Sequence, residues 1–240
     1  MDVPFDILLI IGEFCTKPKM KLLDWIPENK LDWDGLSRNP NSIHMLEANM
    51  NQINWVYLSL NPNGIHLLEA NFEKIQWNNL SANPNGIYLL QTNPDKIYWP
   101  YLSTNPNGIS LLEANMDEID WVRLSYNHNA IHLLKTHPEK IDWCQLSLNP
   151  NGMHLLKDNM DKINWALLSA NPNGTHLLEP MPKKINWTNL SANPNGIHLL
   201  KANPEKINWY WFSSNPNIFE IDIYQTQIHL RNKASQIDWL

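Results

Sequence analysis

Six of the nine histidines recur at one fixed spacing, and histidine is the side chain best suited to proton transfer and metal binding near neutral pH. They are His44, His66, His132, His154, His176 and His198, separated by multiples of 22 residues. Such a column could form a metal ladder or a proton relay. On helices packed side by side, however, neighbours would stand ~10 Å apart, whereas ligands of one zinc ion each lie ~2 Å from the metal. We interpret the column as a helix-face position copied by duplication, with no metal or cofactor site.

No arrangement of residues in the chain indicates catalysis. An enzyme needs a unique constellation of acid, base or nucleophile, and most polar residues here belong to repeating columns. The polar residues outside these columns, among them Cys144, His128, Glu220 and Asp222, match no recognised motif. The sequence contains no glycine-rich phosphate loop, no CxxC pair and no HExxH segment. We expect a non-enzymatic protein with no catalytic residues and no small-molecule substrate.

The overall composition limits the classes of partner and the cellular compartments that we expect for this protein. The net charge of −6 lacks the basic excess of a general nucleic-acid binder. Two cysteines, Cys15 and Cys144, are too few for a disulfide scaffold and favour a reducing compartment. No lysine or arginine precedes the apolar run at 7–11, so the run fits neither a signal peptide nor a membrane span. We expect an intracellular protein that binds neither nucleic acid nor membrane.

Nine tryptophans set the period of the chain. Trp33, Trp55, Trp77, Trp99, Trp121, Trp143, Trp165, Trp187 and Trp209 stand 22 residues apart. The repeating unit reads W-x-x-L-S-x-N-P-N-G-I-H-L-L-E-A-N-P-x-K-I-x, and its Ser and first two Asn columns are constant in all nine copies. A strict period of this length indicates a stack of identical supersecondary units.

The segment NPNGIHLL at 61–68 gives two conflicting signals. Asn-Gly between apolar runs is typical of a hairpin turn, whereas Asn-Pro is typical of a helix start. The glycine is replaced by Ser42, Ala130 and Ile218 in three copies, and a β-branched isoleucine resists the positive φ of a type I′ turn. The sequence therefore predicts a short helix with Asn61 as the N-cap and Pro62 as its first residue. It also predicts a left-handed C-terminal residue at Asn71.

A second short helix is expected to begin near each Trp. The residue before the Trp is Asp or Asn in seven of nine copies, a composition typical of N-caps. Pro100 would then fall in the first turn of such a helix, where proline is tolerated. Two helices per repeat predict an all-α fold, an α-solenoid of about nine repeats. A leucine-rich-like β-solenoid is the alternative, but the proline after Asn and the Leu-Leu pairs disfavour it.

The constant columns are expected to be structural. Nine exposed tryptophans would form a large apolar stripe prone to aggregation, so the sequence predicts that they line the core. The constant Ser and Asn side chains are expected to satisfy backbone groups at helix ends and between turns.

The two ends of the chain depart from the repeat. We divide 1–240 as a single repeat domain with an N-terminal cap at 1–32, tandem repeats at 33–217 and a C-terminal cap at 218–240. Terminal units of a solenoid need altered outer faces, which accounts for the departures.

The units NPNGIHLLEANPEKINW, the segment WIPENKLDW at 25–33 and the segment NPNIFEID at 215–222 resemble a family of short-repeat proteins. That family is encoded in many copies by giant DNA viruses of amoebae, including mimivirus-like viruses. The resemblance covers nearly the whole chain. It implies a viral origin, a repeat fold and a location in the host cytoplasm, the virus factory or the virion. It implies no catalytic activity.

The two residues after each Trp vary most between copies, which indicates exposure. Extended solenoid faces commonly bind protein partners, and aromatic and arginine side chains dominate such interfaces. Tyr98 and Tyr101 in one copy, with Arg123 and Tyr126 in the next, form the richest group of this kind. We predict that they bind a protein partner, viral or from the host. The alternative is a structural component of a virion or virus factory.

Overall fold

The computed structural model describes residues 31–213, 215 and 217. All regular structure in this part of the chain is helical and none of it is strand, which confirms the predicted all-α class and argues against the β-solenoid. The chain divides into two compact units, Met1–Asp120 (unit 1) and Trp121–Leu240 (unit 2). The predicted caps at 1–32 and 218–240 lie outside the described residues, apart from positions 31 and 32.

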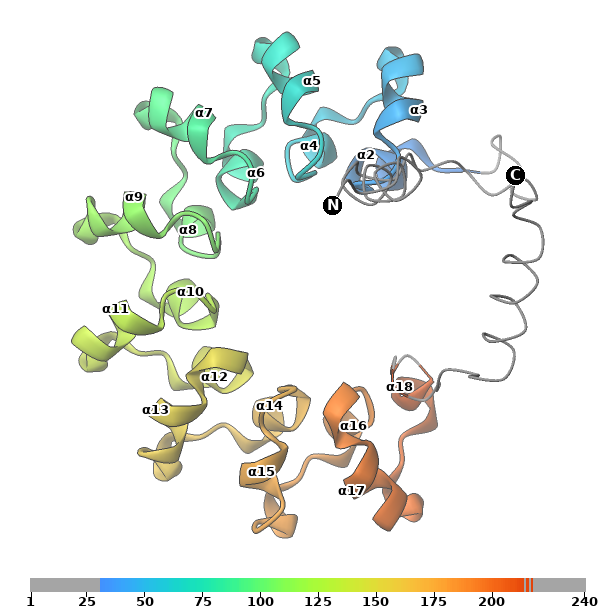
Figure 1. Ribbon diagram of the computed structural model, residues 1–240, viewed down its shortest axis with the longest axis vertical. Helices are drawn as coiled ribbons and strands as arrows, with labels where there is room; N and C mark the ends of the chain where they lie inside the picture. The colour runs from blue at the N-terminus through green and yellow to red at the C-terminus, as the bar shows by residue number, and fades with distance from the viewer. Residues whose placement is uncertain (1–30, 214, 216, 218–240) are drawn as a thin grey trace, which may run out of the picture. The chain divides into compact units, whose positions relative to one another are not determined.

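The first helix of each repeat begins at the Trp, as the sequence predicts. In unit 1 these helices are α2 (Trp33–Arg38), α4 (Trp55–Leu58), α6 (Trp77–Ala82) and α8 (Trp99–Leu102). In unit 2 they are α10 (Trp121–Tyr126), α12 (Trp143–Leu148), α14 (Trp165–Ala170), α16 (Trp187–Ser191) and α18 (Trp209–Phe212). Most begin with a capping side chain; Asp142 Oδ1, for example, accepts from the N–H of Gln145 at 2.8 Å. Within each unit the helices form one row (Figure 1).

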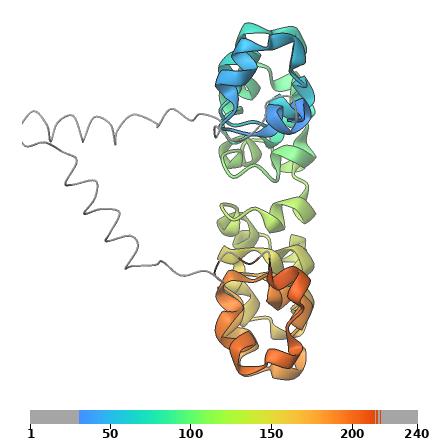
Figure 2. The same cartoon turned by 90° about the vertical axis from the view of Figure 1, so that its right-hand side faces the viewer.

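The second helix of each repeat begins at the Ile column and forms a second row (Figure 1). These helices are α3 (Ile43–Ala48), α5 (Ile65–Ala70), α7 (Ile87–Thr92) and α9 (Ile109–Glu113) in unit 1. In unit 2 they are α11 (Ile131–Thr136), α13 (Met153–Lys157), α15 (Thr175–Leu178) and α17 (Ile197–Ala202). Figure 2 shows the short helices of unit 2 from the side, coloured yellow to orange.

A short 3-10 helix follows each second helix, so that the repeat has three helical segments where the sequence predicts two. They are η2 (Met50–Gln52), η3 (Phe72–Lys74), η4 (Pro94–Lys96) and η5 (Met116–Glu118) in unit 1. In unit 2 they are η6 (Pro138–Lys140), η8 (Met160–Lys162), η9 (Pro182–Lys184) and η11 (Pro204–Lys206). Four of these segments, η4, η6, η9 and η11, begin at a proline, because its fixed φ suits a first helical position.

The NPNG segment forms a turn that leads into the second helix. The sequence predicts that the helix starts at Pro62, but α5 begins at Ile65. The N-cap residue of α5 is Gly64 and not the predicted Asn61, whose Oδ1 accepts from the N–H of Asn63 at 3.0 Å in the preceding turn. In two copies the same residues form 3-10 helices, η7 (Pro150–Gly152) and η10 (Pro194–Gly196). The prediction of a helix in this segment is thus confirmed from the Ile column onward, whereas the predicted N-cap and the predicted first residue of the α-helix are wrong.

The predicted left-handed residue at Asn71 is also wrong. Its φ is −134°, and none of the described residues has a positive φ. Asn71 ends α5 with its side chain instead, because Nδ2 donates to the carbonyl of Leu67 at 2.9 Å. In one copy His137 takes this position, and its Nδ1 lies 3.1 Å from the carbonyl oxygen of Leu133.

Leucines form the core of each unit. The Leu three positions after the Trp and the second Leu of the Leu-Leu pair are almost all fully buried, for example Leu58 and Leu68. The glycine of NPNG packs against this core, since a Cβ at Gly64 would lie 2.6 Å from Leu58 Cδ1. Its φ of −87° is ordinary, so close packing and not backbone freedom favours glycine here. Ala130, also fully buried, shows that one copy accommodates a methyl group.

A buried asparagine joins each repeat to the one before it. Asn83 is fully buried, and its Nδ2 donates to the carbonyls of Ser59 and Asn61, both at 2.9 Å. Its Oδ1 accepts from the N–H of Asn85 at 3.0 Å. Equivalent bonds are made by every member of what we call the asparagine ladder: Asn61, Asn83, Asn105, Asn149, Asn171, Asn193 and Asn215. A primary amide combines two donors and an acceptor on one short side chain, which serine, aspartate and leucine do not.

A buried serine makes a second connection between repeats. Ser81 Oγ donates to the carbonyl of Trp77 at 2.8 Å and accepts from the N–H of Tyr98 in the next repeat at 3.0 Å. The same pair of bonds is made by Ser59, Ser125, Ser147, Ser169 and Ser191. Among the described residues, no buried side-chain nitrogen or oxygen lacks a hydrogen-bond partner. The structure thus confirms the role predicted for the constant Ser and Asn columns.

Replacing one ladder asparagine should destabilise the array strongly. Asn171→Ala removes the donor to Ser147 and Asn149 and the acceptor for the N–H of Asn173. Each unsatisfied buried group costs ~1–3 kcal/mol, so we expect a loss of ~2–4 kcal/mol in the free energy of unfolding, measured by urea titration with circular dichroism. The control Asn151→Ala removes one exposed side-chain bond to His128 and should cost ~1 kcal/mol or less. Equal losses in the two variants would contradict the role of the ladder.

Candidate functional site

The two residues that follow each Trp form the variable columns of the repeat. The first of them is exposed in seven copies, at Asp34, Val56, Asn78, Val122, Cys144, Thr188 and Tyr210. The second is half-buried in most copies, as at Tyr101 and Gln145. Both positions lie in the first turn of the first helix, before the Leu and Ser that face the core. Variation therefore falls where side chains meet solvent, as the sequence predicts.

Tyr98 and Tyr101, two of the predicted partner-binding residues, lie together in unit 1. Their rings meet edge to face with centroids 5.0 Å apart, and 40% of Tyr98 is exposed. Tyr98 is the N-cap residue of α8, but its side chain makes no capping bond. Its backbone N–H is held by Ser81 Oγ at 3.0 Å, which fixes the start of the helix. The pair is thus a rigidly mounted, partly exposed aromatic patch.

Arg123 and Tyr126, the other two predicted residues, lie in unit 2 on α10. Both are exposed, Tyr126 to 51%. Residues three apart on a helix share a face, so that a cation and an aromatic ring stand side by side there. Each unit therefore carries one of the two predicted pairs.

Two exposed aromatic residues of α18 were missed by the sequence prediction. Tyr210 is 80% exposed and Trp211 47% exposed, with ring centroids 5.2 Å apart. They occupy the two variable columns of the last repeat. The run WYWF at 209–212 carried the signal, because this is the one copy with aromatic residues in both variable columns.

The tryptophan column does not form the core that the sequence predicts. The eight tryptophans from Trp33 to Trp187 are half-buried, and Trp209 is 64% exposed. Lysines near the end of the same repeat cover some of the rings: Lys162 Nζ lies 4.5 Å from the centre of the Trp143 ring. Such cation–π contacts stabilise by ~0.5–1 kcal/mol at exposed sites. The smaller leucines fill the core between these very short helices, and the large indole rings pack at the edge of that core.

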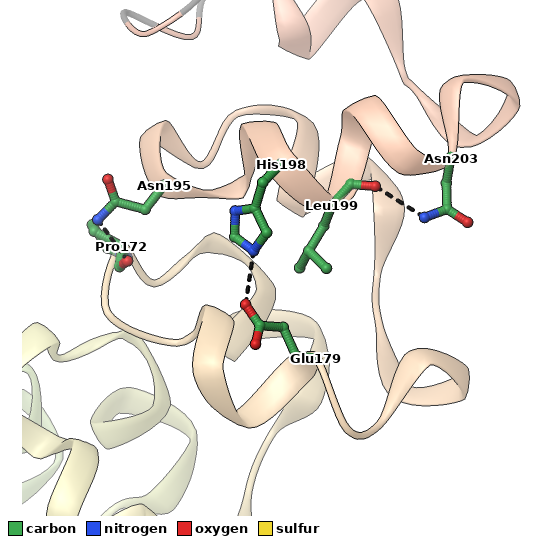
Figure 3. Close-up of polar contacts among 6 residues, drawn as sticks. All are labelled: Pro172, Glu179, Asn195, His198, Leu199 and Asn203. Atoms are coloured by element: carbon green, nitrogen blue, oxygen red, sulfur yellow. Dashed lines mark hydrogen bonds and ion pairs between the residues drawn. The ribbon is translucent and has the colours of Figure 1, made fainter.

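The histidine column lies on the exposed face of the second helices. All six members are exposed. His66 Nε2 lies 2.9 Å from Glu47 Oε1 in the preceding repeat. His198 Nε2 likewise lies 2.8 Å from Glu179 Oε1 in the preceding repeat (Figure 3). Exposed pairs of this kind contribute ~0–1 kcal/mol. Across the described residues, no three His, Cys, Asp or Glu side chains gather closely enough to hold a metal ion.

These features define the class: the protein is an α-solenoid of short repeats whose constant polar residues connect neighbouring copies. Within the described part, none of the helices has the length and apolar character needed to cross a membrane. The chain belongs to the family described as periplasmic copper-binding protein (NosD), whose family model matches residues 24–137 and 80–233. No curated protein and no solved structure matches the chain.

The different burial of two tryptophans in one column gives a test of the packing. Trp187→Ala removes a half-buried ring and should lower the free energy of unfolding by ~2–4 kcal/mol, since large-to-small changes lose both buried area and contacts. Trp209→Ala removes a ring that is 64% exposed and should cost ~1 kcal/mol or less. Thermal melting followed by circular dichroism measures both. A larger loss for Trp209→Ala would show that this ring is covered in solution.

Proposed function

We propose that the chain is a non-enzymatic repeat scaffold that binds another protein through its variable columns. The observation that carries the proposal is the separation between constant residues, which connect the repeats, and varying residues, which meet solvent. Solenoids commonly bind partners along such extended faces.

The constant polar residues are fully used inside the array. Each ladder asparagine commits both amide protons and its carbonyl oxygen to backbone groups, and each constant serine both donates and accepts. These groups are buried and already bonded, so they are not accessible to a ligand. We therefore assign the binding surface to the residues that vary.

The variable columns and their neighbours carry side chains suited to protein recognition. Tyr, Trp and Arg provide most of the binding energy at protein interfaces. Unit 1 presents Tyr98 and Tyr101, and unit 2 presents Arg123, Tyr126 and the aromatic residues of α18. A hydrogen-bonded backbone beneath them limits the conformational entropy lost on binding.

Copper binding, which the family description carries, does not fit the described residues. Copper sites are built from closely grouped imidazole, thiolate and thioether ligands. The six column histidines instead stand at least 22 residues apart on different repeats, no described His, Cys, Asp and Glu side chains gather in threes, and the Nε2 atoms of His66 and His198 are held by glutamates. Cys144 is exposed, and its Sγ lies 3.6 Å from Asn164 Nδ2. We therefore do not include copper in the proposed function.

The resemblance to short-repeat proteins of giant DNA viruses extends the proposal to the partner, a protein of the virus or of its amoebal host. Under the alternative, the chain is a structural component of a virion or virus factory. Purified particles distinguish the two, because a structural component co-purifies with them in fixed stoichiometry.

Two double variants test the variable columns as a binding surface. Tyr98→Ala with Tyr101→Ala changes unit 1, and Arg123→Ala with Tyr126→Ala changes unit 2. The partner is first isolated by affinity purification with the wild-type chain and then titrated against each variant. At least one double variant should weaken binding by ~2 kcal/mol or more, roughly thirtyfold, with an unchanged helical signal.

The matched control is Asn78→Ala with Thr188→Ala, two exposed residues of the first variable column, which should leave binding within roughly twofold of wild type. Asn79 is unsuitable, because its Nδ2 donates to the carbonyl of Val56 in the preceding repeat at 2.9 Å. Wild-type affinity in both aromatic variants, with a loss in the control, would contradict the proposed surface.

A further inference from the structure

Six of the repeats contain an Asn-Gly pair, the dipeptide in which asparagine is chemically least stable. The pairs are 63–64, 85–86, 107–108, 151–152, 173–174 and 195–196. In a flexible chain the backbone nitrogen of the glycine attacks Cγ of the asparagine, since glycine has no Cβ to hinder the approach. An N–Cγ bond forms, the Cγ–Nδ2 bond breaks and Nδ2 leaves as ammonia. Water then opens the resulting succinimide to aspartate or isoaspartate.

The fold holds the attacking nitrogen in all six pairs. The N–H of Gly86 donates to the carbonyl of Asn83 at 3.0 Å, and the five other glycines make the equivalent bond at 2.9–3.1 Å. All six glycines are buried. Because the glycine nitrogen must lose its proton and swing toward Cγ in order to react, this bond opposes the first step.

The fold also holds the leaving group in all six pairs. Asn195 Nδ2 donates to the carbonyl of Pro172 in the preceding repeat at 2.9 Å (Figure 3). The other five asparagines make the same bond to the residue 23 positions earlier, at 2.7–3.0 Å. This bond turns the side-chain amide toward the neighbouring repeat and fixes its rotamer. The two bonds together define what we call the Asn-Gly clamp.

The copies without an Asn-Gly pair are the first copy of each unit and the last copy of the array. They carry Asn41-Ser42, Asn129-Ala130 and Asn217-Ile218, in which a side chain on the second residue hinders the attack. The first and last copies of the array are terminal repeats, which open more readily than inner ones. The reactive pair is thus absent from three copies at the ends of the units.

We propose that the asparagine of each Asn-Gly pair is a latent deamidation site, closed by the clamp in the folded repeat and opened when the repeat unfolds. The product cannot rebuild the clamp. An aspartate has no N–H to donate to the proline carbonyl, and isoaspartate adds a methylene to the backbone. An unfolding event that lasts long enough for deamidation therefore changes the asparagine irreversibly. Each deamidated repeat then lowers the stability of the array.

Peptide mapping by mass spectrometry tests the proposal on the wild-type chain. The protein is incubated at mildly alkaline pH, folded or in concentrated urea, and the mass gain from replacing NH₂ by OH is followed at each pair. We expect all six pairs to react at least roughly tenfold more slowly in the folded chain, the factor that an opening free energy of ~1.4 kcal/mol gives. Rates within twofold of those in urea would overturn the proposal.

A local perturbation tests whether the opening of a single repeat is enough to expose its Asn-Gly pair. Asn171→Ala removes the ladder contacts next to the pair 173–174. Deamidation at Asn173 should then accelerate severalfold, while Asn63 in unit 1 keeps its wild-type rate. An unchanged rate at Asn173 would overturn the role of the clamp. If this variant fails to fold, the wild-type chain in graded urea below its unfolding midpoint replaces it, with site-by-site acceleration expected and flat rates contradicting the proposal.

Discussion

Each α-helix in the described part of this chain has only four to six residues, too few to be stable alone in water. Most of the backbone groups of such a helix lie in its end turns and need partners outside it. The amide of one buried asparagine per repeat provides them, since it takes two carbonyls of the preceding copy and one N–H of its own copy. Without these hydrogen bonds, packing the leucine core would bury unpaired backbone groups, and that burial would cost free energy.

The same constraint separates the structural part of the repeat from the part that is free to evolve. Asn, Ser and Leu columns cannot change without leaving a buried group unpaired or a cavity behind. Residues such as Val56, Arg123 and Tyr210 can change without these two costs, because their side chains are exposed in the first turn of the Trp helices. The partner recognition that we propose therefore uses residues that contribute little to stability. The contacts between repeats also form the Asn-Gly clamp, so the folded array protects a reactive dipeptide from deamidation.

Local rules were enough to predict the period, the all-α class and the caps before the Trp helices, since each depends on residues close in sequence. The partners of the asparagine ladder could not be predicted, because they join residues 22 and 24 positions apart whose meeting depends on helix packing. Asn71 was predicted to be left-handed, whereas its own side chain satisfies the helix end. The tryptophans were placed in the core on hydrophobicity alone, although the narrow space between such short helices accepts leucine better than indole. Variation between copies correctly indicated the exposure of Arg123, whereas Tyr101 is half-buried. The predicted partner-binding group left out Tyr210 and Trp211, although they stand in the same columns.

Native-state hydrogen exchange tests the central claim most directly. The backbone N–H groups of Asn63, Asn85, Asn151 and Asn173 belong to exposed turn residues, yet each donates to a ladder Oδ1 at 2.9–3.0 Å. If the asparagine ladder holds the repeats together, these amides should exchange as slowly as the amides of the buried leucines, because both open only when a repeat unfolds. Exchange at the rate of unprotected loop amides, with the leucines still protected, would show that the repeats are held by the leucine core alone.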